Sequence, residues 1–133
     1  MRSRALSGAL AHAVGSPRVQ NGLRVEVRRE QGATVLVVAG ELDLATSRAL
    51  EEQLELVTAG SNSAEPLILD LRELEFMDST GLSVLVNAHQ RAQQAGRRFG
   101  VIRGRRQVQR LLSLTGVADR MPVADSVQEL LAG

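Results

Sequence analysis

Short apolar segments alternate with segments of helical periodicity along most of this chain, and this order restricts the folds that it can adopt. Residues 34–40, "TVLVVAG", and 66–71, "PLILDL", are continuous apolar runs of the kind expected for strands covered on both faces. Residues 97–104 and the neighbourhood of Met121 predict two further strands. Strands that are each followed by a helix predict an α/β domain whose sheet is mostly parallel in its middle.

The first predicted strand differs from the others, because "LRVEVRR" (23–29) alternates apolar and charged residues. Alternation indicates one solvated face, so we expect this strand at an edge of the sheet. The expected order is β-β-α-β-α-β-α-β-α, with about five strands in a mixed, mostly parallel sheet. The helices are predicted by apolar residues at helical spacing and by capping residues, at about 47–59, 79–95, 105–115 and 126–131.

The composition is that of one ordinary globular domain. Of the 133 residues, 44% are apolar and 23% are charged, and the formal net charge is +1. This balance gives no steering toward nucleic acid or a membrane surface, so we expect neither as a direct partner. The absence of cysteine excludes disulfides, thiolate metal sites and a cysteine nucleophile, and it fits a cytoplasmic protein. No apolar run in the sequence approaches the roughly 20 residues that span a bilayer.

Residues 1–21 lack a sustained period and end in the turn-rich "GSPRVQNG". Two arginines before a weakly apolar stretch give this segment some likeness to a signal peptide. Its apolar part is short and is interrupted by Ser7, Gly8 and His12, which favours a disordered leader instead. We therefore expect a leader at 1–21 and one domain at 22–133.

Two strand-to-helix loops, "GELDLAT" and "FMDSTG", carry the residues of greatest functional interest. Such loops gather at the carboxyl ends of parallel strands, so Asp43, Asp78, Ser79 and Thr80 are expected on one rim. The simpler interpretation is that Asp78 or Ser79 caps the helix that follows. A capping position is compatible with a regulatory one, because a helix N-terminus offers N–H donors and partial positive charge that tolerate a phosphoryl group.

The sequence gives little indication of a catalytic site. Ser79 lacks a G-x-S-x-G elbow, and His89 lies ten residues along the same predicted helix, about 15 Å away. Asp43, Asp70 and Asp78 do not follow the spacing of a metal-binding loop, although they leave a weak Mg²⁺ site at the strand ends open. We therefore expect no enzyme activity, no cofactor and no metal.

Six arginines between positions 97 and 110 either form a solvated surface or hold a phosphate. The second interpretation leads to an alternative function, a module that binds a small ligand such as a nucleotide or lipid at the same rim without a kinase partner.

Three stretches together resemble the STAS domain of bacterial anti-sigma factor antagonists: "GELDLATSRALEEQL", "LILDLRELEFMDSTGLSVLV" and "LLSLTGVADRMPVADSVQELL". The resemblance runs from about Leu23 to the C-terminus, and the Asp-Ser-Thr-Gly-Leu block is its most specific part. It implies a single domain with a mixed sheet and helices packed mainly on one face. It also implies function by protein binding, without catalysis.

In that family the unphosphorylated antagonist binds an anti-sigma factor and releases a sigma factor. The anti-sigma factor is also a serine kinase of the histidine-kinase-like ATPase fold, and a phosphatase resets the switch. The resemblance makes Ser79 the expected phosphoacceptor, with Thr80 as the second choice. It places the partner-binding surface at Glu41, Asp43, Asp78, Ser79, Thr80, Gly81 and Ser83, of which Ser83 departs from a glycine common at its position.

Overall fold

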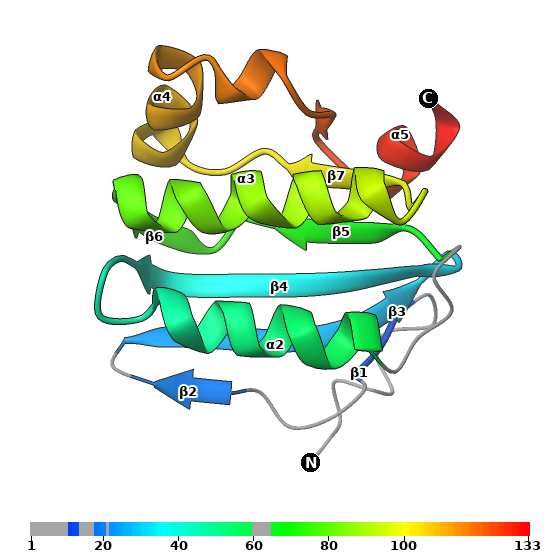
Figure 1. Cartoon of the computed structure of the whole chain (residues 1–133), viewed down its shortest axis with the longest axis horizontal. Helices are drawn as coiled ribbons and strands as arrows, with labels where there is room; N and C mark the ends of the chain where they lie inside the picture. Colours follow the sequence, from blue (N-terminus) through cyan, green and yellow to red (C-terminus); the bar gives the residue numbers. More distant parts are fainter. Residues whose placement is uncertain (1–10, 14–17, 21, 60–64) are drawn as a thin grey trace.

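The structure, a computed structural model, describes residues 11–13, 18–20, 22–59 and 65–133. It contains one mixed sheet with helices on both faces (Figure 1). The strands are β1 (Ala11–Ala13), β2 (Arg18–Gln20), β3 (Leu23–Glu30), β4 (Ala33–Leu42), β5 (Leu67–Asp70), β6 (Leu74–Met77), β7 (Phe99–Ile102) and β8 (Val123–Ala124). The helices are α2 (Ser47–Ala59), α3 (Ser79–Gln94), α4 (Arg106–Leu114), the 3₁₀ turn η1 (Val117–Asp119) and α5 (Val127–Ala132).

The sheet has the predicted mixture of antiparallel and parallel pairing. β3 and β4 form an antiparallel hairpin closed by Gln31 and Gly32, both with positive φ, while β4, β5, β7 and β8 follow one another in parallel. Parallel neighbours need a crossover, and α2, α3 and α4 with η1 supply the three crossovers. The prediction of an α/β domain with a mostly parallel centre is confirmed.

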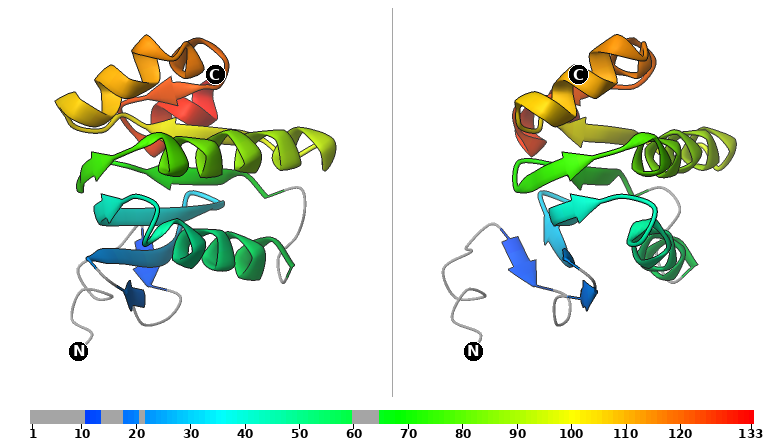
Figure 2. Two further views of the ribbon diagram at one scale, coloured as in Figure 1. Left: turned by 60° about the vertical axis from the view of Figure 1, so that its left-hand side comes forward. Right: turned by 90° about the vertical axis from the view of Figure 1, so that its left-hand side faces the viewer.

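Two apolar clusters divide the helices between the faces of the sheet. The main core joins Leu36 and Val38 of β4 to apolar side chains of α2, α3 and α4. A smaller cluster on the opposite face joins Val35 and Val37 to Val127 of α5. Figure 2 shows α2 and α3 on one side of the sheet and α5 on the other. Helix packing is therefore mainly on one face, as the resemblance implied.

The short strand β6 was not predicted, because "RELEFM" shows neither a continuous apolar run nor regular alternation. It pairs in parallel with the end of β4, beyond the segment of β4 that pairs with β5. On its other side, the Gln107 side chain of α4 takes the place of a strand. Met77 N donates to Gln107 Oε1 at 3.0 Å, and Gln107 Nε2 donates to Met77 O at 3.0 Å.

The structure describes six residues of the expected leader. Residues 11–13 and 18–20 lie in β1 and β2, which both pair antiparallel with β3, so these six residues extend the sheet. Residues 1–10, 14–17 and 21 lie outside the described part, and the leader boundary stays a prediction. In the described ranges, no helix is both long enough and apolar enough to cross a bilayer.

We expect Gln107→Ala to lower the free energy of unfolding by about 1–2 kcal/mol, because two hydrogen bonds each contribute about 0.5–1.5 kcal/mol. Hydrogen exchange of the Met77 amide should accelerate more than that of the core of β4. Gln90→Ala is the matched control, since Gln90 is exposed on α3. Equal stability of the two variants in urea unfolding would show that the Gln107 amide does not hold β6.

Candidate functional site

Close packing of α3 on the end of β4 brings the two predicted loops together. Asp78 N donates to Leu42 O at 3.2 Å, which ties the start of α3 to the last residue of β4. A Cβ on Gly81 would lie 2.7 Å from Leu42 Cγ and 2.8 Å from Leu42 O. Only glycine permits this approach, and the "MDSTG" and "GELDLAT" loops therefore share one end of the sheet (Figure 1). We call this end, from Glu41 to Thr46 and from Glu75 to Ser83, the rim.

Asp78 is the N-cap of α3. Its Oδ1 accepts from Thr80 N at 2.9 Å and from Gly81 N at 3.0 Å, while Leu82 N donates to Asp78 O at 3.0 Å. Three of the first four N–H groups of α3 are thus already bonded. The helix start therefore offers fewer free donors than the sequence led us to expect: a phosphoryl group on Ser79 would find only the Ser79 N–H without a bond among the described residues.

The β4–α2 turn is held in a similar way by Asp43 and Thr46. Asp43 Oδ1 accepts from Ala45 N at 3.0 Å and from Thr46 N at 3.2 Å. The Thr46 hydroxyl is buried, donates to Glu41 O at 2.8 Å and accepts from Asp43 N at 2.9 Å. Both aspartates of the rim are therefore fixed by their own backbones, and each presents its second carboxylate oxygen without a hydrogen bond to a described residue.

Ser79 is the first residue of α3 and is exposed. Its hydroxyl makes no hydrogen bond with the described residues, whereas its carbonyl accepts from Ser83 Oγ at 3.1 Å. Ser83 lies one turn further along α3 and is also exposed, Thr80 is half-buried, and Gly81 is buried. All seven predicted site residues thus lie on the rim, and Ser79 is the exposed residue of the Asp-Ser-Thr block.

His89 is not placed to act as a base for Ser79. His89 lies on the same helix, and its ring packs against Phe99 with the centroids 5.4 Å apart. Asp70 is paired with Arg72 through two hydrogen bonds, of 3.0 Å and 2.8 Å, and this pairing raises the pKa of the Arg72 guanidinium. Asp70 therefore does not join Asp43 and Asp78 in a magnesium site. Within the described ranges, no group of three or more carboxylates and histidines is placed to hold a metal ion.

The arginines between positions 97 and 110 do not converge on one site. Arg98 donates to carbonyls at the C-terminus, Arg103 pairs with Asp125 at 2.8 Å, and Arg105 donates to Arg72 O. Arg97 is buried beside α3. These contacts indicate that the arginines serve separate surface and structural roles. They do not support a shared phosphate-binding site at the rim.

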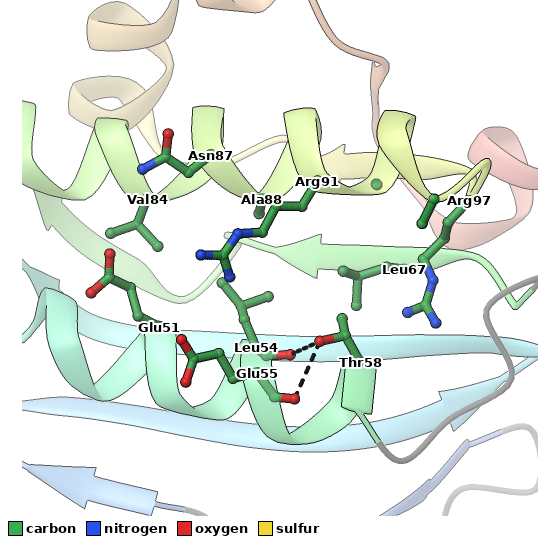
Figure 3. A pocket seen from close by; sticks show the side chains of 12 residues that line it. Glu51, Leu54, Glu55, Thr58, Leu67, Val84, Asn87, Ala88, Arg91 and Arg97 are labelled. Carbon is green, nitrogen blue, oxygen red and sulfur yellow. Dashed lines mark hydrogen bonds between the residues drawn. The ribbon is translucent and has the colours of Figure 1, made fainter.

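A pocket of about 320 Å³ lies between α2 and α3 (Figure 3), and Ser79 is not among its lining residues. Leu54, Leu67, Val84 and Ala88 form an apolar lining, and Arg91 extends across the opening from α3 toward α2. A pocket of this size is at the lower limit for small-molecule sites. It can hold an apolar group of modest size.

The sequence reasoning missed four residues that build or surround the rim. Thr46 and Gln107 fix its two loops by the hydrogen bonds described above. Leu44 is an exposed apolar side chain in the β4–α2 turn, and Phe76 is one in β6. A large apolar residue inside a polar turn was the available signal for Leu44, whereas nothing in the sequence locates Gln107 beside Met77.

Removing the capping oxygen of α3 should lower the stability of the protein, whereas removing only the negative charge of Asp78 should not. We expect Asp78→Ala to lower the free energy of unfolding by about 1 kcal/mol, the usual cost of losing an N-cap. Asp78→Asn retains Oδ1 and is expected to stay within a few tenths of a kcal/mol of the wild type. Urea unfolding of the three proteins tests this, and equal loss in both variants would contradict the capping role.

Two matched glycine substitutions test the contact between α3 and β4. Gly81→Ala should destabilise the protein by about 1–2 kcal/mol, since its clash with the Leu42 carbonyl exceeds the gain of about 1 kcal/mol in helix propensity. At Gly100, an added Cβ would meet Leu130 Cδ2 at 2.7 Å, at the end of a side chain that can move. Gly100→Ala should therefore cost less, and the reverse order in thermal unfolding would contradict the close approach at Gly81.

Comparison with known proteins identifies the family of this chain. The STAS domain model matches residues 24–130. The chain is 31% identical over 104 residues to an anti-sigma F factor antagonist of Paenibacillus polymyxa, covering 78% of this chain and 88% of that protein. It is 31% identical over 113 residues to the anti-sigma-F factor antagonist RsfB of Mycobacterium tuberculosis, covering 85% and 90%.

A solved structure agrees with these sequence relatives. The crystal structure of an anti-sigma factor antagonist from Mycobacterium paratuberculosis superposes with a TM-score of 0.74 at 29% identity, covering 86% of this chain and 95% of that one. The chain therefore belongs to the STAS domain family.

Proposed function

We propose that this protein is an anti-sigma factor antagonist whose binding is switched by phosphorylation of Ser79. The observation that carries the proposal is an exposed serine hydroxyl, without a hydrogen bond to any described residue, at the first position of α3 on a rim that also carries Glu41, Asp43 and Asp78. The relatives named above as anti-sigma factor antagonists support the partner class.

In this proposal the unmodified rim binds an anti-sigma factor of the histidine-kinase-like ATPase fold, and the bound sigma factor is released. The same partner then transfers a phosphoryl group from ATP to the Ser79 oxygen, which loses its proton as the new O–P bond forms and ADP leaves. A serine phosphatase restores the hydroxyl by hydrolysis. The protein itself supplies no catalytic group.

The position of Ser79 allows this modification without loss of the fold. The cap of α3 uses the Asp78 carboxylate and backbone N–H groups, and the Ser79 hydroxyl takes no part in it. Added phosphate would bring about −1.5 to −2 charges to the rim and leave the core contacts of Leu82 and Leu85 in place. The modification would therefore act on recognition and not on folding.

A second candidate, a small-ligand module, is carried by the pocket between α2 and α3 and not by the rim. Its apolar part suits a lipid chain better than a nucleotide base, because neither phenylalanine of the sequence, Phe76 or Phe99, is among its lining residues, and the sequence contains no Trp or Tyr. Calorimetric titration with ATP, GTP and a medium-chain fatty acid distinguishes the two ligand classes, and no heat from any of them removes this candidate.

The proposed phosphorylation can be located directly. The protein is incubated with ATP and each anti-sigma factor of the stated fold from the same organism, and the phosphate is mapped by mass spectrometry. We expect one phosphoryl group on Ser79 and at least a hundredfold lower incorporation in Ser79→Ala.

Ser83→Ala is the matched control, because it removes another exposed hydroxyl from the same face of α3. Phosphate that persists at full level in Ser79→Ala would move the acceptor to Thr80 or Ser83 and reject Ser79. Binding to none of the anti-sigma factors, with or without ADP and ATP, would reject the proposed function itself.

A further inference from the structure

Two of the exposed large apolar side chains lie on the rim. Four such side chains are present in the described ranges: Leu44 at 78% exposure, Leu56 at 60%, Phe76 at 41% and Leu114 at 73%. Leu44 is in the turn between β4 and α2, and Phe76 is near the end of β6. Leu56 lies in the second half of α2, and Leu114 ends α4, so these two residues occupy other parts of the surface.

Both rim side chains are close enough to Ser79 to share one standard interface with it. Phe76 is three residues from Ser79, which limits the separation of their Cα atoms to about 11 Å. Leu44 is two residues from Leu42, whose carbonyl accepts from Asp78 N, so Leu44 lies within about 17 Å of Ser79. A standard interface covers about 800 Å² on each partner, which corresponds to a disc of about 16 Å radius.

The charges on the rim set the sign of the electrostatic effect. Its carboxylates are Glu41, Asp43, Glu75 and Asp78, and none of them makes a salt bridge with a described residue. Arg105 and Arg106, beside Gln107, are exposed cations at this end of the sheet that make no salt bridge with a described residue, and Arg48 pairs with Glu52 at 3.5 Å. The rim is therefore net acidic and complements a basic partner surface.

This sign conflicts with a switch based on charge repulsion alone. If a basic surface docks on an acidic rim, a phosphoryl group adds negative charge and would strengthen the attraction between the two proteins. If phosphorylation nevertheless releases the partner, it must remove a favourable contribution to the binding free energy other than charge attraction. Apolar contacts can supply that contribution, because they form only when water leaves the interface.

We infer that Leu44 and Phe76 are the apolar anchors of the docking surface, and that phosphate on Ser79 acts by holding water between them and the partner. The inference rests on the proposed function and specifies its partner, an anti-sigma factor surface with apolar sockets surrounded by arginine or lysine. The phosphate remains hydrated because three of the first four N–H groups of α3 are already bonded. An ion that has one free N–H donor, that of Ser79, is still costly to strip of water, so the anchors cannot reach their sockets.

Alanine substitutions test the anchors against matched controls. Leu44→Ala and Phe76→Ala should each raise the Kd for the unphosphorylated complex at least tenfold, since anchors near the centre of an interface dominate its affinity. Leu56→Ala and Leu114→Ala remove the same kind of exposed apolar surface elsewhere and should change the Kd less than twofold. Because all four positions are exposed, circular dichroism melts should remain close to that of the wild type.

Salt dependence tests the mode of switching. Phosphoserine is incorporated at position 79 during translation, so this experiment does not need the kinase reaction. The Kd of the unmodified complex should rise between 50 mM and 500 mM NaCl, as expected for opposite charges. The ratio of the phosphorylated to the unmodified Kd should not fall over that range. If phosphate acted by repulsion between like charges, salt would screen the repulsion and bring the ratio toward one.

The outcomes separate this inference from the proposed function. If the unmodified protein binds and phosphoserine releases it, while Leu44→Ala and Phe76→Ala behave like the controls, the anchors are rejected and the function stands. If the ratio of the phosphorylated to the unmodified Kd falls toward one at high salt, the hydration mechanism is rejected. If the Kd of the unmodified complex does not rise with salt, the basic partner surface is rejected. If the unmodified protein binds no anti-sigma factor, both the function and the inference fail.

Discussion

The contact between Gly81 and Leu42 is the constraint on which the rest of the site depends. It seats the first turn of α3 directly on the last residue of β4, and it leaves no space for a Cβ. Because β4 pairs with β3, β5 and β6, this single contact fixes α3 relative to most of the sheet. The two aspartate-bearing loops are neighbours as a result, although they are 35 residues apart in sequence, from Asp43 to Asp78.

The rim combines rigid backbone with accessible side chains. One carboxylate oxygen of Asp78 and one of Asp43 each accept two hydrogen bonds from nearby backbone N–H groups. These bonds hold the two loops in place within the protein itself. Ser79 contributes nothing to this local order beyond its backbone. A residue that can be altered without cost to the fold, on a surface that is already formed, is well suited to regulation by modification.

The sequence was sufficient to predict the alternation of strands and helices, because continuous apolar runs such as 34–40 mark buried strands. It also limited the cap of α3 to Asp78 or Ser79, since capping depends only on the next few residues, and the structure assigns this role to Asp78. It could not predict β6, whose pairing depends on the distant end of β4. The contact of Gln107 with Met77 and the exposure of Leu44 likewise depend on tertiary packing.

The amide of Gln107 has a further consequence for the behaviour of the protein in a crowded solution. A strand with unoccupied N–H and C=O groups on one side is a template for pairing with other chains. Gln107 occupies the Met77 groups on the side of β6 that faces away from β4. One side chain of α4 therefore keeps this part of β6 from pairing with a foreign strand, while the neighbouring rim stays exposed to solvent.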